Sequence, residues 1–175
     1  MAARKPKNGG VTVLADSVEM VLMDSIQPHP KNVRQGDIGA ICQSIQVNGF
    51  YRSLIVQRST RNILAGNHTW YAARQVGMLE VPVTWIDCDD DRALRILLVD
   101  NRSNDLASYD DSALAELLQG IQSESGTLLG TGYDGDALDQ LLADLAAGGA
   151  SPDEPAESDA TVSVQCPACG HTFTP

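Results

Sequence analysis

One stretch, residues 63–77, limits the possible folds of this chain more than any other. A short apolar run ends at Gly66, and directly after it a helical pattern begins with Trp70, Ala73 and Val76 on one side. A strand that passes through glycine into a helix directs backbone N–H groups and the positive helix end toward one point. Such junctions are typical of sites that bind phosphate and other anions. An ordinary strand–helix junction that binds only water is the alternative.

The residues of this turn divide into caps and candidate ligand contacts. Asn67 is a residue type that favours the N-cap position, and Gly77 is typical of a helix end. Gly66 would let a phosphate approach the main chain closely. His68 and Thr69 would face that phosphate from the first helical turn. We therefore predict an anion site at this turn.

Apolar periodicity predicts short strands and helices on both sides of the turn. The expected strands are residues 18–23, 54–57, 63–64 and 81–86. The second and third of these form a hairpin. Helices are expected to begin at capping residues, namely Asp37, Asp89 or Asp90, the run Asp110-Asp111-Ser112, and Asp136.

The prolines and one cysteine allow further predictions about local structure. Pro82 marks either the beginning of its strand or a strand at the edge of the sheet. His29 lies between two prolines and is expected in an exposed loop, with ligand contact as the alternative. Cys42 lies on the apolar stripe of a helix and is expected to be a core residue.

Composition and charge divide the chain into two halves. Its 175 residues, of which 43% are hydrophobic, can form one domain with appendages. Residues 1–86 carry a net charge of +4 and residues 87–175 a net charge of −15. The acidic half disfavours non-specific nucleic-acid binding by the whole chain, whereas the basic half can bind a nucleotide or DNA locally. An acidic surface that only aids solubility is the alternative.

The sequence gives no sign of membrane insertion or export. No apolar run approaches the ~20 residues that span a bilayer, and the basic residues Arg4, Lys5 and Lys7 are not followed by an apolar segment. We therefore expect a cytoplasmic protein with no membrane partner. Its four cysteines are then expected to stay reduced.

Four segments resemble, in order, the motifs of one family. They are I-Q-P-H-P-K-N-V-R at 26–34, S-I-Q-V-N-G through L-I-V at 44–56, G-N-H-T-W-Y-A-A at 66–73 followed by V-P-V, and D-N-R-S-N-D-L at 100–106. On these motifs, residues 17–106 resemble the ParB/sulfiredoxin N-terminal domain, often labelled a ParB-like nuclease domain. The Gly-Asn-His and Asp-Asn-Arg sequences resemble the actinobacterial phage and prophage members.

The resemblance implies an α+β fold, a small mixed sheet with helices, followed by an acidic helical extension over residues 107–146. It implies ATP or CTP with Mg²⁺, held by the Gly66 turn and by the segment around Asn101. Relatives include chromosome-segregation clamps that bind and hydrolyse CTP, sulfiredoxins that use ATP, and domains beside phage DNA methylases. DNA or a DNA-modifying or phage protein is therefore an expected partner, and a homodimer is an open alternative.

The turn and the matched motifs together give a candidate site. Its nucleotide-binding residues are Arg34, Gly66, Asn67, His68, Thr69, Asn101 and Arg102. Arg34 and Arg102 would pair with the phosphates. Asp100 or Asn101 would contact Mg²⁺ or the nucleotide, and His68 or Asp100 is the candidate catalytic base.

The chain departs from the family pattern in several places. Thr69 stands where the family has an arginine, so a hydroxyl replaces a guanidinium that would neutralise a phosphate. Ser53 stands where the family has a proline. The sulfiredoxin cysteine is not present beside Gly66, which argues against sulfinic-acid reduction. The acidic, leucine-rich helices after residue 106 do not resemble a helix-turn-helix domain, so site-specific DNA clamping would need a partner.

The two ends of the chain differ in composition from the middle. Residues 1–16 predict a flexible basic arm, and residues 147–161 predict a disordered linker.

In the last segment, residues 162–175, Cys166, Cys169 and His171 resemble one zinc knuckle. A closed Zn²⁺ site would take its fourth ligand from a second chain or from elsewhere in this one. A knuckle that binds no metal is the alternative.

Three functions stay open at this point. The first, which we favour, is a nucleotide-binding module that acts with DNA or DNA-acting partners, with NTP hydrolysis or phosphotransfer undecided. The second is a non-catalytic adaptor that recruits partners through its acidic helices and zinc-knuckle tail, and the third is a metal-dependent nuclease. A pocket that unites Asn67, His68 and Asn101 favours nucleotide chemistry, whereas a pocket filled by Trp70 or Tyr71 favours the adaptor.

Overall fold

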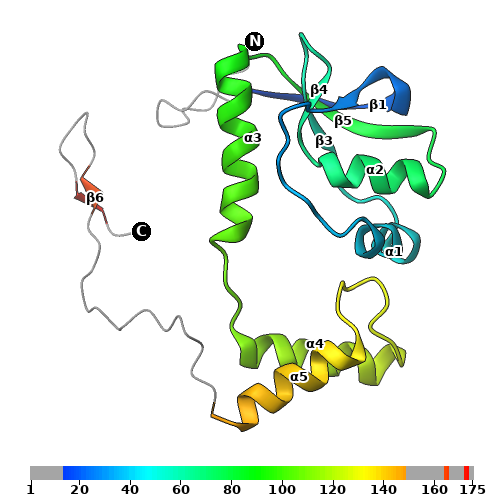
Figure 1. The fold of residues 1–175 in the computed structure, drawn as a ribbon, viewed down its shortest axis with the longest axis vertical. Coiled ribbons are helices and arrows are strands. Elements are labelled where there is room, and N and C mark those ends of the chain that lie inside the picture. Colours follow the sequence, from blue (N-terminus) through cyan, green and yellow to red (C-terminus); the bar gives the residue numbers. More distant parts are fainter. Residues whose placement is uncertain (1–13, 149–163, 166–171, 174–175) are drawn as a thin grey trace, which may run out of the picture.

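A five-stranded mixed sheet forms the centre of the fold (Figure 1). The structure is a computed structural model in which residues 14–148, 164–165 and 172–173 are described. The strands, in the order β1-β5-β3-β4-β2 across the sheet, are β1 (Ala15–Leu22), β2 (Gln27–Pro28), β3 (Leu54–Gln57), β4 (Asn62–Ala65) and β5 (Glu80–Ile86). β3 and β4 form the predicted antiparallel hairpin, while β3 is parallel to β5 and β2 is parallel to β4.

Five α-helices in the described part of the chain complete the α+β architecture, which confirms the predicted fold class. They are α1 (Ile38–Asn48), α2 (Asn67–Gln75), α3 (Asp90–Asp105), α4 (Asp111–Ser125) and α5 (Gly135–Ala146). The side chains of Asp37, Asp89 and Asp110 accept backbone N–H groups at the starts of α1, α3 and α4, as predicted. The cap of α5 is Asp134, two residues before the predicted Asp136.

The two faces of the sheet are covered by different helices. Because strand residues alternate between faces, Ile63 points to one side of β4 and Leu64 to the other. α2 packs Trp70 and Ala73 on the first face, in a core of aliphatic residues and Trp85. α3 packs against β4 and buries its own Ala93 and Leu97. The Gly66 turn joins β4 of the sheet to α2, and it lines one cavity together with the end of α3.

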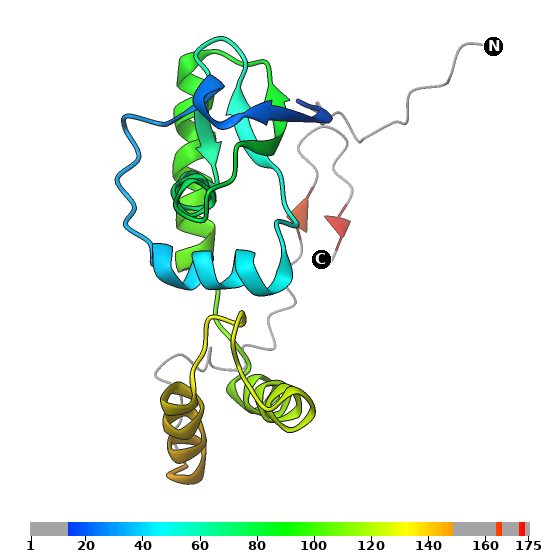
Figure 2. The same cartoon turned by 90° about the vertical axis from the view of Figure 1, so that its right-hand side faces the viewer.

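The helical extension has a small core of its own. α4 and α5 form a hairpin that buries Leu118, Leu128 and Leu138 between them. In both views α1 lies between the sheet and this hairpin (Figure 1, Figure 2).

Of three local predictions, two are wrong and the one for Pro82 holds in one of its two alternatives. β1 begins at Ala15, inside the predicted flexible arm. β5 lies between β1 and β3, so Pro82 is near the beginning of its strand but not at an edge. His29 is only 8% exposed, because its loop packs against the Gly66 turn. Cys42, by contrast, is buried as predicted.

Beyond residue 148 the description covers only a short hairpin. β6 (Val164–Gln165) and β7 (Thr172–Phe173) pair in antiparallel orientation. The predicted zinc ligands Cys166, Cys169 and His171 lie outside the described residues, as does most of the predicted linker.

None of the helices in the described ranges combines the length and the apolar composition that are needed to cross a bilayer.

Candidate functional site

The Gly66 turn accepts no residue other than glycine without rearrangement. Gly66 has φ of 92° and is the N-cap of α2. A Cβ added there would lie 2.6 Å from Cδ2 of Leu54, whose side chain is fully buried. The backbone therefore turns from β4 into α2 with no side chain between the turn and the sheet.

The prediction that Asn67 caps α2 is wrong. Its Oδ1 accepts the backbone N–H of His29 at 2.8 Å, and its Nδ2 donates to the carbonyl oxygen of Ile63 at 3.2 Å. Asn67 is thus a buried cross-link between the end of β2 and β4. No side chain caps α2, so the first N–H groups of the helix are left for a ligand or water.

A polar cavity of about 390 Å³ opens at this helix end. Seven of the predicted site residues line it together: Arg34, Gly66, Asn67, His68, Thr69, Asp100 and Asn101. The eighth, Arg102, is exposed on α3 and is not among the lining residues.

The predicted site residues did not include five lining residues, Gly36, Ile41, Arg52, Asn104 and Tyr109. The position of Arg52 could have been predicted from the hairpin. Ile55 of β3 pairs with Ala65 of β4 in antiparallel orientation, so the residues just before β3 lie beside the residue just after β4. Once the hairpin is predicted, its register brings Arg52 to the Gly66 turn.

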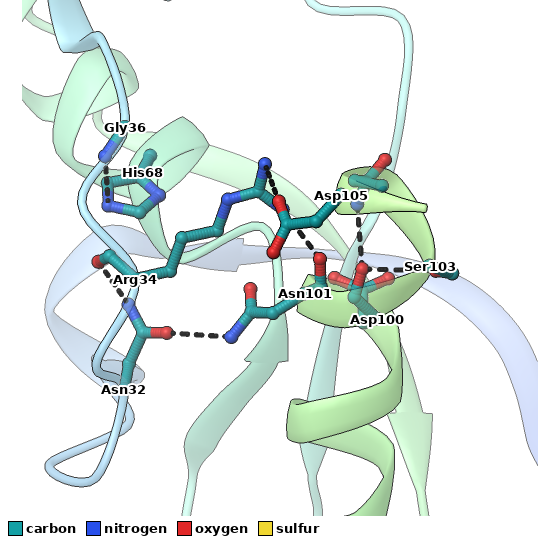
Figure 3. A network of polar contacts seen from close by, with 9 residues as sticks. Asn32, Arg34, Gly36, His68, Asp100, Asn101, Ser103 and Asp105 are labelled. Carbon is teal, nitrogen blue, oxygen red and sulfur yellow. Dashed lines mark hydrogen bonds and ion pairs between the residues drawn. The ribbon is translucent and has the colours of Figure 1, made fainter. Parts of the chain in front are cut away.

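His68 is held by the loop that precedes α1 (Figure 3). Its Nε2 accepts the backbone N–H of Gly36 at 3.0 Å. In a neutral ring the proton is then on Nδ1. His68 therefore offers a hydrogen-bond donor to a ligand, and its predicted role as a base would require the bond to Gly36 to open.

Arg34 ties the same loop to the last turns of α3 (Figure 3). Its Nη1 donates to the carbonyl oxygen of Asn101 at 2.9 Å, and its Nη2 pairs with Oδ1 of Asp105 at 3.1 Å. Asn101 in turn donates from Nδ2 to Oδ1 of Asn32 at 3.2 Å. The ion pair is partly exposed and therefore weak, so a phosphate can compete with Asp105 for Arg34.

Asp100 brings a carboxylate to the cavity. Its backbone carbonyl accepts Nδ2 of Asn104 at 2.7 Å and Oγ of Ser103 at 3.2 Å, which fixes the end of α3. Within the described residues no group of three or more His, Cys, Asp or Glu side chains is placed so that it could hold a metal ion. A carboxylate that supplies one ligand suits Mg²⁺, which completes its shell with water and phosphate oxygens.

A second, less polar cavity of about 400 Å³ adjoins the first. α1, residues 49–52 and residues 130–132 of the extension form its walls. Ile41, Arg52 and Thr69 line both cavities. The site is therefore one continuous depression with a polar half at the start of α2 and a more apolar half along α1.

His29 stabilises this site through its contact with Asn67. Its backbone N–H donates to Asn67, and its Nδ1 accepts the backbone N–H of Lys31 at 3.1 Å. Burial lowers the pKa of His29 below its ordinary 6.5, and the charge of Lys31 lowers it further, against an opposing effect of Asp90. The fold therefore favours the neutral imidazole.

We expect acid to destabilise the fold through His29. Because its pKa is lower in the folded chain, the unfolded chain binds the proton more readily, so the stabilisation by neutral His29 decreases as pH falls below about 6.5. Urea unfolding of the wild type and of His29→Gln at pH 7.5 and 5.5 measures this contribution. The free-energy loss on acidification should be smaller in the variant, and equal losses would contradict the assignment.

The comparisons with known proteins agree with this architecture. A model of the ParB N-terminal domain family matches residues 7–102, more than half of the chain. The chain belongs to the ParB N-terminal domain family. All seven predicted residues that line the polar cavity lie within the matched part.

Individual ParB proteins resemble the chain only in part. The probable chromosome-partitioning protein ParB of Rickettsia conorii is 27% identical over 95 residues, which are 52% of this chain and 33% of that protein. The probable chromosome 1-partitioning protein ParB of Deinococcus radiodurans is 28% identical over 120 residues, 66% of this chain and 41% of that protein. The chain thus matches only a third to two fifths of the length of these relatives.

Among solved structures, the fold is similar to that of the C-terminally truncated chromosome-partitioning protein ParB of Caulobacter crescentus, complexed with CTP-gamma-S. The TM-score is 0.62, the identity is 19%, and the match covers 75% of this chain and 79% of that one. At this identity the likeness shows a shared fold.

Proposed function

We propose that this ParB N-terminal domain binds a nucleoside triphosphate with Mg²⁺ and works with DNA or a DNA-acting partner. The uncapped start of α2, which opens into a polar cavity between Arg34 and Arg52, is the observation that carries the proposal. The triphosphate would lie in that cavity, and the base and ribose in the adjoining apolar cavity.

Each side chain then has a distinct task. The first N–H groups of α2 and the helix dipole attract the phosphates. Arg34 and Arg52 supply positive charge from opposite sides of the turn, and Nδ1–H of His68 and the hydroxyl of Thr69 add donors. Asp100 would hold Mg²⁺ against the phosphate oxygens. If hydrolysis or phosphotransfer occurs, Asp100 is the better placed of the two candidate bases, because Nε2 of His68 is occupied.

Two further observations support nucleotide binding over a purely structural adaptor. Trp70 is buried in the core and Tyr71 is 44% exposed, and neither lines the polar cavity. The similar ParB of Caulobacter crescentus was solved in complex with CTP-gamma-S. The names of the curated relatives, chromosome-partitioning proteins, support a role alongside DNA.

Calorimetry with CTP, ATP and GTP in the presence of Mg²⁺ tests the proposal. The wild type should bind at least one of the three, and Arg52→Ala should weaken that binding by about tenfold, since a charge-assisted contact to phosphate contributes roughly 1.5–3 kcal/mol. Arg74→Ala is the matched control, because Arg74 lies on α2, whose first turn faces the cavity, but pairs with Asp24 outside the cavity.

The control variant should bind as the wild type does. No heat with any of the three nucleotides would refute the proposed function. Equal losses in Arg52→Ala and Arg74→Ala would place the ligand elsewhere on the molecule.

A further inference from the structure

Resting on the proposed function, we propose that the helical extension completes the nucleotide site. The segment Gly130, Thr131 and Gly132 forms one wall of the apolar cavity and docks on α1. Nucleotide binding and docking of the α4–α5 hairpin therefore stabilise each other.

One residue of the loop, Gly130, makes two hydrogen bonds to α1. Nδ2 of Asn48 donates to the carbonyl oxygen of Gly130 at 2.9 Å, and Oε1 of Gln43 accepts the N–H of Gly130 at 3.2 Å. Both side chains project from α1, five residues apart. Together they bind both polar groups of Gly130, which is buried against the helix.

The contact also requires glycine on steric grounds. Gly130 has φ of +86°, and a Cβ added there would lie 2.9 Å from Cβ and Cγ1 of Val47 and 3.0 Å from Nδ2 of Asn48. Cβ of Val47 is bonded directly to the helix backbone, so it can move aside only if α1 moves as well. The loop thus approaches α1 as closely as its backbone permits.

The docked loop is firmly attached to the two helices behind it. Leu128 is buried with Leu118 and Leu138 in the core of the hairpin. Oγ1 of Thr131 and the backbone N–H of Thr131 both donate to the carbonyl oxygen of Leu128, at 2.7 and 3.1 Å. A displacement of the loop therefore displaces α4 and α5 with it.

The docking is weak enough for a ligand to influence it. On either side of the Gly130 contact lie cavities of about 300 and 270 Å³, both lined by Gln43 and Tyr133. Two hydrogen bonds between uncharged groups stabilise the docked state only modestly, because water competes for the same donors and acceptors. A ligand that contacts α1 and the loop at once binds the docked state better, and by linkage it shifts the population toward that state.

Hydrogen–deuterium exchange and calorimetry on the full chain test this inference. In the wild type, the nucleotide that binds with Mg²⁺ should slow amide exchange throughout residues 111–148. Gly130→Ala should weaken nucleotide binding by about tenfold or more and abolish the slowing. Gly126→Ala is the matched control, since Gly126 has φ of +74° but no atom within 4 Å of an added Cβ, and it lies outside both halves of the site.

A second variant is needed in case Gly130→Ala prevents the hairpin from folding. Gln43→Ala leaves the extension unchanged and removes a side chain that does not line the apolar cavity, so any loss of affinity, expected to be about threefold to fivefold, comes through docking.

The outcomes separate the two proposals. If the wild type binds a nucleotide but Gln43→Ala and Gly130→Ala bind it equally well, or if exchange in residues 111–148 does not change, the inference is refuted and the nucleotide site stands. If the wild type binds none of CTP, ATP and GTP, the proposed function and the inference both fail.

Discussion

Asn67→Ala is expected to lower the free energy of unfolding by about 3 kcal/mol. The side chain is 5% exposed and bonds the N–H of His29 and the carbonyl oxygen of Ile63. Its loss removes a hydrogen bond from each of two backbone groups, at a cost of roughly 1–3 kcal/mol for a buried group that loses its partner. Urea unfolding followed by circular dichroism measures the change, which is a large part of the 5–15 kcal/mol that stabilises a typical domain.

Asn62→Ala provides the control for this experiment. Asn62 lies on β4, the strand that leads into α2, and accepts a hydrogen bond from Gln27 at 2.9 Å, but that bond is exposed to solvent. Its loss should cost less than about 1 kcal/mol, since water replaces the missing partner. Similar losses in both variants would show that Asn67 is not the buried cross-link described above.

Gly66→Ala is expected to cost about 2–4 kcal/mol of unfolding free energy and to weaken nucleotide binding. An alanine in the left-handed region costs roughly 1 kcal/mol, and its Cβ would press against the buried Leu54, which adds roughly 1–3 kcal/mol of overpacking. The turn would relax by moving α2 away from β3, and with it the N–H groups that face the cavity.

Gly77→Ala separates the cost of the left-handed backbone from the cost of overpacking. Gly77 follows the same helix with φ of +86°, and no atom lies within 4 Å of an added Cβ. It should therefore show only the backbone term of about 1 kcal/mol and unchanged nucleotide affinity. If Gly66→Ala were no less stable than Gly77→Ala, the close approach to Leu54 would carry no energetic weight.

Local chemistry could be predicted from this sequence better than tertiary placement. The Asp37 cap was predicted at its own residue, and the caps of α3 and α4 to within two or three adjacent residues, because a cap depends on a few neighbouring positions. Asn67 was misassigned by the same rule. Its side chain could cap α2, but it bonds instead to His29, 38 residues away along the chain, and no local pattern reveals that competitor.

The candidate site shows the same difference between local chemistry, which could be predicted, and tertiary placement, which could not. The Gly66 turn and the motif around Asn101 were recognised as a ligand site from sequence, and the structure brings them to one cavity. The wall at Gly130 was not anticipated, because a loop between two acidic helices has no sequence feature that points to α1. Arg102 was favoured for its charge, yet on α3 it lies away from the cavity that Asn101 lines, since adjacent helical residues face different directions.

The walls of the polar cavity come from stretches of chain that are far apart in sequence. They include the loop before α1, the connection from α1 to β3, the start of α2 and the end of α3. An extended polypeptide has no such enclosure, so a ligand of this cavity binds the native state alone and adds RT ln(1 + [L]/Kd) to its stability. The abundance of the ligand in a cell would then govern how long each copy of the domain survives proteolysis, as well as how often the cavity is filled.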